Sequence, residues 1–263
     1  MLTVKNYVRA KTVQEAYELC QKKSNVVLGG MLWLKMQNRN VNTAVDLCDL
    51  GLDKIIEEED CFKIGAMVSL RQIETNKRLN EFAGGAFADA VKDIVGVQFR
   101  NMATVGGSIY GRFGFSDVLT LFQVLGAKVN LYNAGIMDIC EFASMDRKIK
   151  DILTEIIIPK TDIKAVYLSQ RNSATDFPVL SCAVSRINGV YNCSVGARPS
   201  AAGLFKDEKG FLNDGITEQS AEKFAEYVSE NAVFGSNMRG GADYRKKVCA
   251  VLVRRALVKL GDK

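Results

Sequence analysis

The order of hydrophobic and polar positions predicts a succession of short strands and helices in the first part of the chain. Behind Thr12, apolar residues recur at helical spacing and predict a capped helix over residues 13–22. Val26-Val27-Leu28 has the pattern of a short buried strand and leads into Gly29-Gly30. Met31 to Gln37 is then expected to begin a second helix, whose amino terminus would favour an anion.

The middle of the chain has a mixed pattern. Strands are expected at residues 41–47, 55–56, 61–64, 128–132 and 155–158, and helices at 69–75, 85–91 and from Ser116 to about Leu125. The segment Gln98 to Gly107, which carries a second double glycine, is expected to be a loop. Pro159 marks a boundary, because proline fixes its own backbone and favours extended geometry in the residue before it.

From about residue 164 the pattern becomes that of a β-meander closed by helices. Three strands are expected at 165–170, 179–187 and 189–195, with Asn188-Gly189 as a hairpin turn, followed by helices at 218–230 and 244–260. In the last helix the expected inward residues are Tyr244, Val248, Val251, Leu252 and Leu257, and the expected outward ones are Lys246, Lys247, Arg254, Arg255 and Lys259. The whole pattern predicts an α+β protein in three parts, residues 1–50, 51–160 and 164–263.

Composition excludes several classes of site and partner. The chain has 263 residues, a net charge of +5, seven scattered cysteines and no histidine. It has no Cys-x-x-Cys pair, so no local motif for a zinc site or an iron–sulfur cluster is present, and histidine-dependent acid–base catalysis is excluded. Basic and acidic residues are mostly interspersed, which argues against nucleic-acid binding. No apolar run is long enough for a bilayer, so we expect no membrane partner and a cytoplasmic location.

The two double glycines are the main functional clue. Glycine allows the backbone to approach a ligand closely, so consecutive N–H groups can converge on an anion without a basic side chain. Either turn alone would be weak evidence, because double glycines are common in ordinary turns.

Several ordered segments resemble the FAD-binding medium subunit of molybdenum hydroxylases, such as xanthine dehydrogenase and carbon monoxide dehydrogenase. They include Leu28-Gly-Gly, Ile64-Gly-Ala-Met-Val-Ser-Leu, Arg100-Asn-Met-Ala-Thr-Val-Gly-Gly, Ser116-Asp117 and Arg239-Gly-Gly-Ala-Asp-Tyr-Arg245. The resemblance covers roughly residues 5 to 260. It implies a two-subdomain FAD-binding fold of the molybdenum hydroxylase and vanillyl-alcohol-oxidase type, followed by a carboxy-terminal α+β domain with an antiparallel three-stranded sheet and helices.

The resemblance also implies where FAD would lie. Its diphosphate would be contacted by two glycine segments, comprising Val27, Leu28, Gly29, Gly30, Met31, Leu32, Trp33 and Leu34, and Thr104, Val105, Gly106, Gly107 and Ser108.

Four further positions match cofactor contacts in the family, each with an ordinary structural alternative. Asp117 would accept hydrogen bonds from ribose hydroxyls, or it is a helix N-cap or first-turn acid. Tyr110 would contact the isoalloxazine ring, or it packs in the core. Ile94 and Leu153 would line the cleft, although isolated apolar residues are more often core residues.

The first glycine segment departs from the family pattern. Met31 stands where the family commonly has threonine, so a hydroxyl that could bind phosphate is absent, and Ser108 replaces an asparagine. Tyr167 falls near a position often occupied by lysine, and Arg112 to Phe115 replaces a segment of small residues and proline. Weaker FAD binding is one consequence of these differences.

Three functions follow from the resemblance. The favoured one is an electron-transfer subunit of an oxidoreductase, in which FAD takes electrons from a [2Fe-2S] small subunit and passes them to an acceptor such as NAD, while a large subunit holds the molybdenum cofactor. The second is a structural subunit that has weakened or lost FAD binding. The third is a stand-alone flavin reductase or oxidase, for which the chain shows no matching substrate-binding elements.

Overall fold

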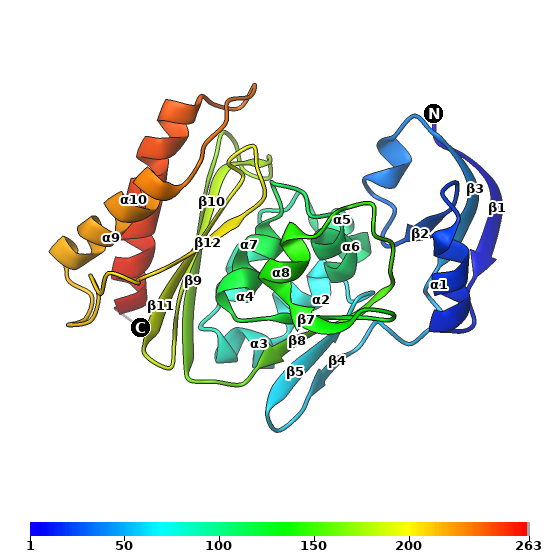
Figure 1. The fold of residues 1–263 in the computed structure, drawn as a ribbon, viewed down its shortest axis with the longest axis horizontal. Helices are drawn as coiled ribbons and strands as arrows, with labels where there is room; N and C mark the ends of the chain where they lie inside the picture. The colour runs from blue at the N-terminus through cyan, green and yellow to red at the C-terminus, as the bar shows by residue number, and fades with distance from the viewer. Residues whose placement is uncertain (262–263) are drawn as a thin grey trace. The chain divides into compact units, whose positions relative to one another are not determined.

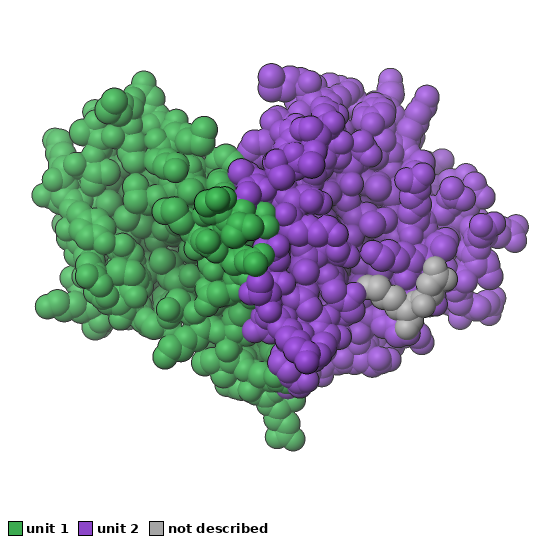
Figure 2. All heavy atoms as spheres, turned by 180° about the vertical axis from the view of Figure 1, so that it is seen from behind, with its two compact units in different colours: residues 1–72, 97–111, 127–159 green, residues 73–96, 112–126, 160–263 purple. Residues whose placement is uncertain are grey.

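The computed structural model describes residues 1–261, and these form two compact units that interleave along the chain (Figure 2). The first unit consists of residues 1–72, 97–111 and 127–159, and the second of residues 73–96, 112–126 and the chain from 160 onward. No helix within residues 1–261 combines the length and apolar character needed to cross a bilayer.

A three-stranded parallel sheet opens the first unit, in the order β1 (Thr3–Arg9), β3 (Asn40–Asp46) and β2 (Val26–Leu28) (Figure 1). Parallel neighbours need a crossover, which is supplied by α1 (Val13–Gln21). Thr12 caps this helix by accepting a hydrogen bond from the amide of Glu15, as the sequence predicts.

The predicted helix over Met31–Gln37 is wrong. Only one turn of 3₁₀ helix forms there, over Leu34–Met36, and Met31 has a left-handed backbone with φ = 59°. A residue in that conformation cannot belong to a right-handed helix, so the helix cannot start directly after Gly30.

The predicted loop at Gln98–Gly107 is also wrong, because it contains two short helices, α5 (Val97–Met102) and α6 (Val105–Tyr110). Thr104 caps α6 through a hydrogen bond from the amide of Gly107 to its hydroxyl. The glycines of the second pair therefore lie in the first turn of a helix, where their low helix propensity hid them from a pattern-based prediction.

A second sheet in the same unit is antiparallel and has the order β4 (Ile55–Glu57), β5 (Cys61–Gly65), β8 (Leu153–Pro159), β6 (Lys128–Leu131) and β7 (Gly135–Asp138). Helix α8 (Ile139–Ser144) follows β7 directly, and α2 (Leu70–Thr75) follows β5.

The second unit is built on a four-stranded antiparallel sheet in the order β12 (Gly203–Lys206), β11 (Val190–Gly196), β10 (Pro178–Ile187) and β9 (Ile163–Arg171). The three predicted strands are present, and the short β12 extends the sheet by one. Asn188 and Gly189 both have positive φ, at 48° and 85°, as the predicted two-residue hairpin turn requires.

Helices cover both faces of this sheet. Helices α9 (Glu218–Asn231) and α10 (Ala242–Gly261) pack against each other, and α10 packs on β9 and β10. Helices α4 (Ala86–Val91) and α7 (Asp117–Val124) pack on the sheet as well, α4 on β9 and α7 on β10 and β11. Helix α3 (Lys77–Phe82) precedes α4.

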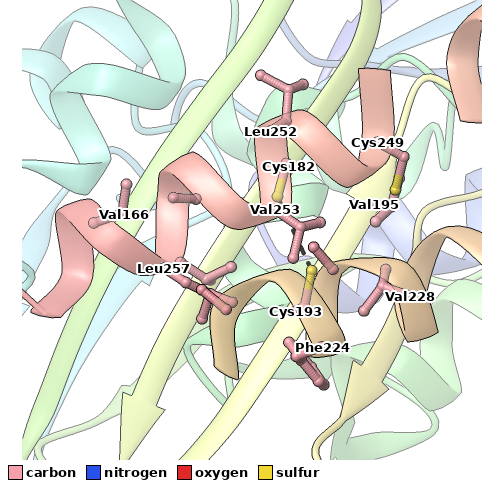
Figure 3. Close-up of a cluster of buried hydrophobic side chains, with 14 of the residues drawn as sticks. Val166, Cys182, Cys193, Val195, Phe224, Val228, Cys249, Leu252, Val253 and Leu257 are labelled. Carbon is pink, nitrogen blue, oxygen red and sulfur yellow. Dashed lines mark hydrogen bonds between the residues drawn. The ribbon is translucent and has the colours of Figure 1, made fainter. Parts of the chain in front are cut away.

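The two faces of the sheet differ in chemistry. Toward α9 and α10 the core is apolar, and Figure 3 shows Cys182, Cys193 and Val195 of the strands among Leu252 and Leu257 of α10. Buried serines of the sheet instead bond to α7, and this set comprises Ser181 with Thr120, Ser185 with the carbonyl of Val124, and Ser194 with Gln123.

The expected orientation of α10 is partly wrong. Leu252 and Leu257 are buried as predicted, but the side chains of Tyr244 and Val251 are 46% and 39% exposed. The buried face is centred on Cys249, and a helix has 3.6 residues per turn, so Val251 falls on the opposite side.

Candidate functional site

The two double-glycine segments meet within the first unit, although they are far apart in the sequence. A Cβ atom placed on Gly29 would lie 2.8 Å from Thr104 Oγ1 and 3.6 Å from the Cα of Gly107. A Cβ atom on Gly30 would overlap the backbone carbonyl of Met102. The segments therefore pack backbone against backbone, which requires residues without side chains.

The loop after Gly29 offers backbone donors. Within residues 1–261, the amides of Gly30, Met31 and Leu32 donate no hydrogen bond to another protein group. Met31 interrupts the regular backbone with its left-handed conformation. Successive N–H groups around a left-handed residue form a concave binding site for anions. The backbone of this loop therefore presents donors suited to a phosphate, and these donors do not depend on the missing threonine hydroxyl.

The second glycine segment has its amides already engaged. All four amides of residues 105–108 donate within the protein, two of them to carbonyls in residues 66–68 and two of them to Thr104. The expected donation from this segment to a diphosphate thus competes with existing hydrogen bonds. The second glycine segment therefore contributes mainly to the shape of the site, and contributes few free hydrogen-bond donors.

Gly107 supplies that shape. It is exposed, and the only atom that a Cβ at this position would approach within 4 Å is Thr104 Oγ1, at 3.0 Å. The surface beside the loop of Gly29 is therefore open at Gly107. A site with backbone donors on one side and a bare Cα on the other fits a diphosphate, which needs close backbone approach.

Trp33 holds the first loop on α5. Its ring packs edge-on against Phe99, with the ring centroids 5.6 Å apart. Of the other predicted contacts in this loop, Leu28 and Leu32 are buried and belong to the core, whereas Val27 and Leu34 are half-buried. Phe99 and Met102 were missed in the sequence, because both lie in the segment that was expected to be an irregular loop.

Tyr110 has structural partners within the first unit. Its hydroxyl accepts a hydrogen bond from the amide of Asp151 at 2.9 Å, and its ring lies 5.8 Å from that of Phe142. The buried carboxylate of Asp151 in turn accepts bonds from the amides of Asn133 and Ala134, which close the β6–β7 turn. Tyr110 thus has the packing role that was weighed as its alternative, and contact with a flavin ring stays a prediction.

Asp117 lies in the second unit, in the first turn of α7, where Ser116 is the N-cap. Its buried carboxylate accepts a hydrogen bond from the Tyr167 hydroxyl and forms an ion pair with Arg171 at 2.9 Å. Burial raises the pKa of the Asp117 carboxyl, while the Arg171 charge and the Tyr167 hydroxyl act in the opposite direction. Burial and the Asp117 charge raise the pKa of Tyr167, which keeps its phenol protonated as a donor.

The cluster of Asp117, Tyr167 and Arg171 satisfies both carboxylate oxygens from within the protein. Binding of a ribose at Asp117, as expected from the sequence, would have to compete with these two partners, so it stays a prediction. The position of Asp117 in the first helical turn agrees with the alternative weighed for it. The sequence showed Arg171 and Tyr167 separately; they share one face of β9, and the packing of α7 on the sheet brings Asp117 to them.

The two apolar positions have different surroundings. Leu153 is 5% exposed and pairs with Leu131 in the sheet of the first unit, whereas Ile94 is half-buried in the second unit. Leu153 thus has the packing expected of a core residue and Ile94 does not, and the contact of either with a cofactor stays a prediction.

Comparison with known proteins decides the family. Residues 2–161 match the family described as the FAD binding domain in molybdopterin dehydrogenase. This chain belongs to that family. The glyceraldehyde dehydrogenase medium chain of Sulfolobus acidocaldarius is 24% identical to it over 95% of this chain and 96% of its own length. The nicotine 6-hydroxylase medium subunit of Paenarthrobacter nicotinovorans is 23% identical over 97% and 96%, respectively.

Solved structures agree on the fold. A carbon monoxide dehydrogenase from Hydrogenophaga pseudoflava superposes with a TM-score of 0.85 at 21% identity, covering 97% of this chain and 96% of the other. Quinoline 2-oxidoreductase from Pseudomonas putida gives 0.83 at 18% identity, with 98% and 96% covered. The chain is thus an FAD-binding oxidoreductase subunit of the molybdenum hydroxylase type, and the predicted family, cofactor and α+β fold are confirmed.

Proposed function

We propose that this chain is the electron-transfer subunit of a molybdenum hydroxylase complex. In this role it receives electrons from a [2Fe-2S] small subunit, while a large subunit holds the molybdenum cofactor and oxidises the substrate. Bound FAD supplies the redox chemistry and delivers the electrons to an acceptor such as NAD. We also propose that the complex is located in the cytoplasm, as expected from the sequence.

The observation that carries the proposal is the contact between the two glycine segments. The free amides of Gly30, Met31 and Leu32 lie in a loop whose Gly29 packs on Gly107. Hydrogen bonds to a charged acceptor contribute about 1.5–3 kcal/mol each, so a few such donors can hold a diphosphate. No side chain of the chain has to act as an acid or base.

The first test is the flavin content of the purified chain after reconstitution with excess FAD and removal of unbound cofactor. About one FAD per chain is expected, measured by absorbance and by fluorescence after acid release. A chain that retains no flavin, both alone and in its native complex, would favour the structural subunit with lost FAD binding. Flavin reduction by the native complex, with its substrate added, then tests the electron route separately.

The variant Gly107→Ala sharpens this test. Its methyl group would occupy the open surface beside the first glycine loop, with only the Thr104 hydroxyl near it. We expect FAD affinity to fall about tenfold or more, the equivalent of losing one charged hydrogen bond, while the thermal unfolding temperature stays nearly unchanged. Unchanged flavin affinity in a folded Gly107→Ala protein would place the diphosphate elsewhere.

Gly30→Ala is the matched comparison. Here the added methyl group would overlap the carbonyl of Met102, so the two segments must separate. This variant should lose both FAD and thermal stability. The pair of variants therefore distinguishes a glycine that makes room for a ligand from one that makes room for the backbone.

A further inference from the structure

Helix α10 carries an exposed apolar stripe on the side opposite to the face that it buries in the core of the second unit. Tyr244, Val251 and Val258 are 46%, 39% and 37% exposed and follow one another at intervals of seven residues. Seven residues are nearly two helical turns, so the three side chains lie in one line on the outer face, drifting by about 20° per interval. At about 1.5 Å per residue the stripe is roughly 21 Å long.

Cations border this stripe on both sides. On a helix surface the neighbours of Val251 are the residues three and four positions away, and three of these four are Lys247, Arg254 and Arg255. All three are exposed, and within residues 1–261 none of them forms an ion pair. Asp243 is the one acidic residue of the described helix. Only one apolar position per heptad is filled, so the stripe is narrower than the two-position seam of a coiled coil, but its course along the helix axis suits a second helix that lies alongside α10.

The same charges select the kind of partner. A second copy docking through this stripe would place Lys247, Arg254 and Arg255 beside their own equivalents, and like charges in an interface are strongly unfavourable. A bilayer is also a poor partner, because the exposed apolar strip is one side chain wide, and the broad apolar face of α10 is already buried (Figure 3). Acidic residues on a partner helix would instead meet these cations.

We propose that the outer face of α10 docks an amphipathic helix of a different protein, with apolar residues at its centre and Glu or Asp along both edges. The docking surface consists of Tyr244, Val251 and Val258 with the bordering cations Lys247, Arg254 and Arg255. This inference uses neither FAD nor the electron route, so it can fail while the proposed function holds, and the reverse.

The first experiment places a photo-crosslinking amino acid at position 251 of the full-length chain in the cells that produce it. Mass spectrometry of the crosslinked peptide should identify a helical segment with apolar residues at heptad spacing and flanking acidic residues. Crosslinks to a second copy, to lipid, to a segment without this pattern, or no crosslink at all would overturn the proposal.

The second experiment reverses two of the bordering charges. Arg254→Glu with Arg255→Glu should weaken co-purification of the crosslinked partner about tenfold or more, and the wild-type complex should weaken as salt is raised. Lys22→Glu with Lys23→Glu is the control, because both lysines are exposed, the charge change is equal and the site lies in the first unit. Equal retention of the partner by both double variants would contradict the proposal.

Discussion

At the scale of single residues, the strongest prediction concerns the buried charge of Asp117. Its carboxylate is held by Arg171 and Tyr167, so Asp117→Asn would leave the guanidinium of Arg171 buried without its anion. Removing one member of a buried ion pair costs about 3–5 kcal/mol. We expect a fall of this size in the free energy of unfolding, measured by urea denaturation.

A double variant and an exposed pair control this measurement. Adding Arg171→Met to Asp117→Asn should recover part of the lost stability, because the unpaired charge is then removed. Glu81→Gln breaks only exposed ion pairs, those of Glu81 with Lys77 and Arg78, and should cost less than about 1 kcal/mol. If Asp117→Asn instead leaves stability unchanged and lowers FAD affinity, the carboxylate binds the ribose, as expected from the sequence.

Asp117 also shows what a sequence can reveal of a site. Its helix position could be predicted, because the N-cap and the following apolar spacing are local features. Its partners could not, since Arg171 and Tyr167 lie on the distant strand β9 and meet Asp117 only because α7 packs on the sheet. The same holds for Gly30, whose need for a bare Cα arises from Met102 in a distant segment.

At the scale of elements, Arg245 joins the start of α10 to the segments around it. It is fully buried, and its guanidinium donates to the carbonyls of Val179, Gly235 and Gly240 and to the side chain of Asn237. Arginine can satisfy these acceptors together because its donors form a planar fork, which a lysine ammonium cannot reproduce. A positive charge alone is therefore not enough to satisfy the four acceptors around this position.

Arg245→Lys should consequently destabilise the protein by about 3 kcal/mol, because the carbonyls of Val179, Gly235 and Gly240 all lose the guanidinium donor. Arg254→Lys, on the exposed face of the same helix, should change stability by less than about 0.5 kcal/mol. Thermal unfolding of both variants checks this. Equal unfolding temperatures would mean that other groups or water can replace the guanidinium.

Elements with a strong local pattern were predicted well, and those determined by context were not. The meander strands are apolar runs joined by a clear Asn188-Gly189 turn, α9 has a capped helical pattern, and all of them were found in the sequence. Strand β1 was missed, because it is an edge strand whose residues are nearly all exposed, so it has no buried face to produce a pattern. Helix α6 was missed because its two glycines suggested a turn.

At the scale of the whole molecule, the interleaving of the two units decides whether residues 164–263, which the sequence predicts as a separate part, have a complete core of their own. Its sheet has one face covered by α9 and α10, but α4 and α7, which pack on the sheet as well, belong to residues 73–126. Ser181, Ser185 and Ser194 are fully buried and bond to α7. Without α7 these hydroxyls and their apolar neighbours would face water, so the fragment would lack part of the core of its unit.

We therefore expect residues 160–263, produced alone, to be poorly folded, with weak protection of the β10 and β11 amides from hydrogen exchange. Adding residues 73–126 as a second fragment should restore protection, because α7 returns the partners of the buried serines. The exchange of the 160–263 fragment alone, measured under the same conditions, is the control. A fully protected and cooperatively unfolding 160–263 fragment would show that the carboxy-terminal part is an independent domain, as the sequence predicts, and that α7 only covers a sheet stable without it.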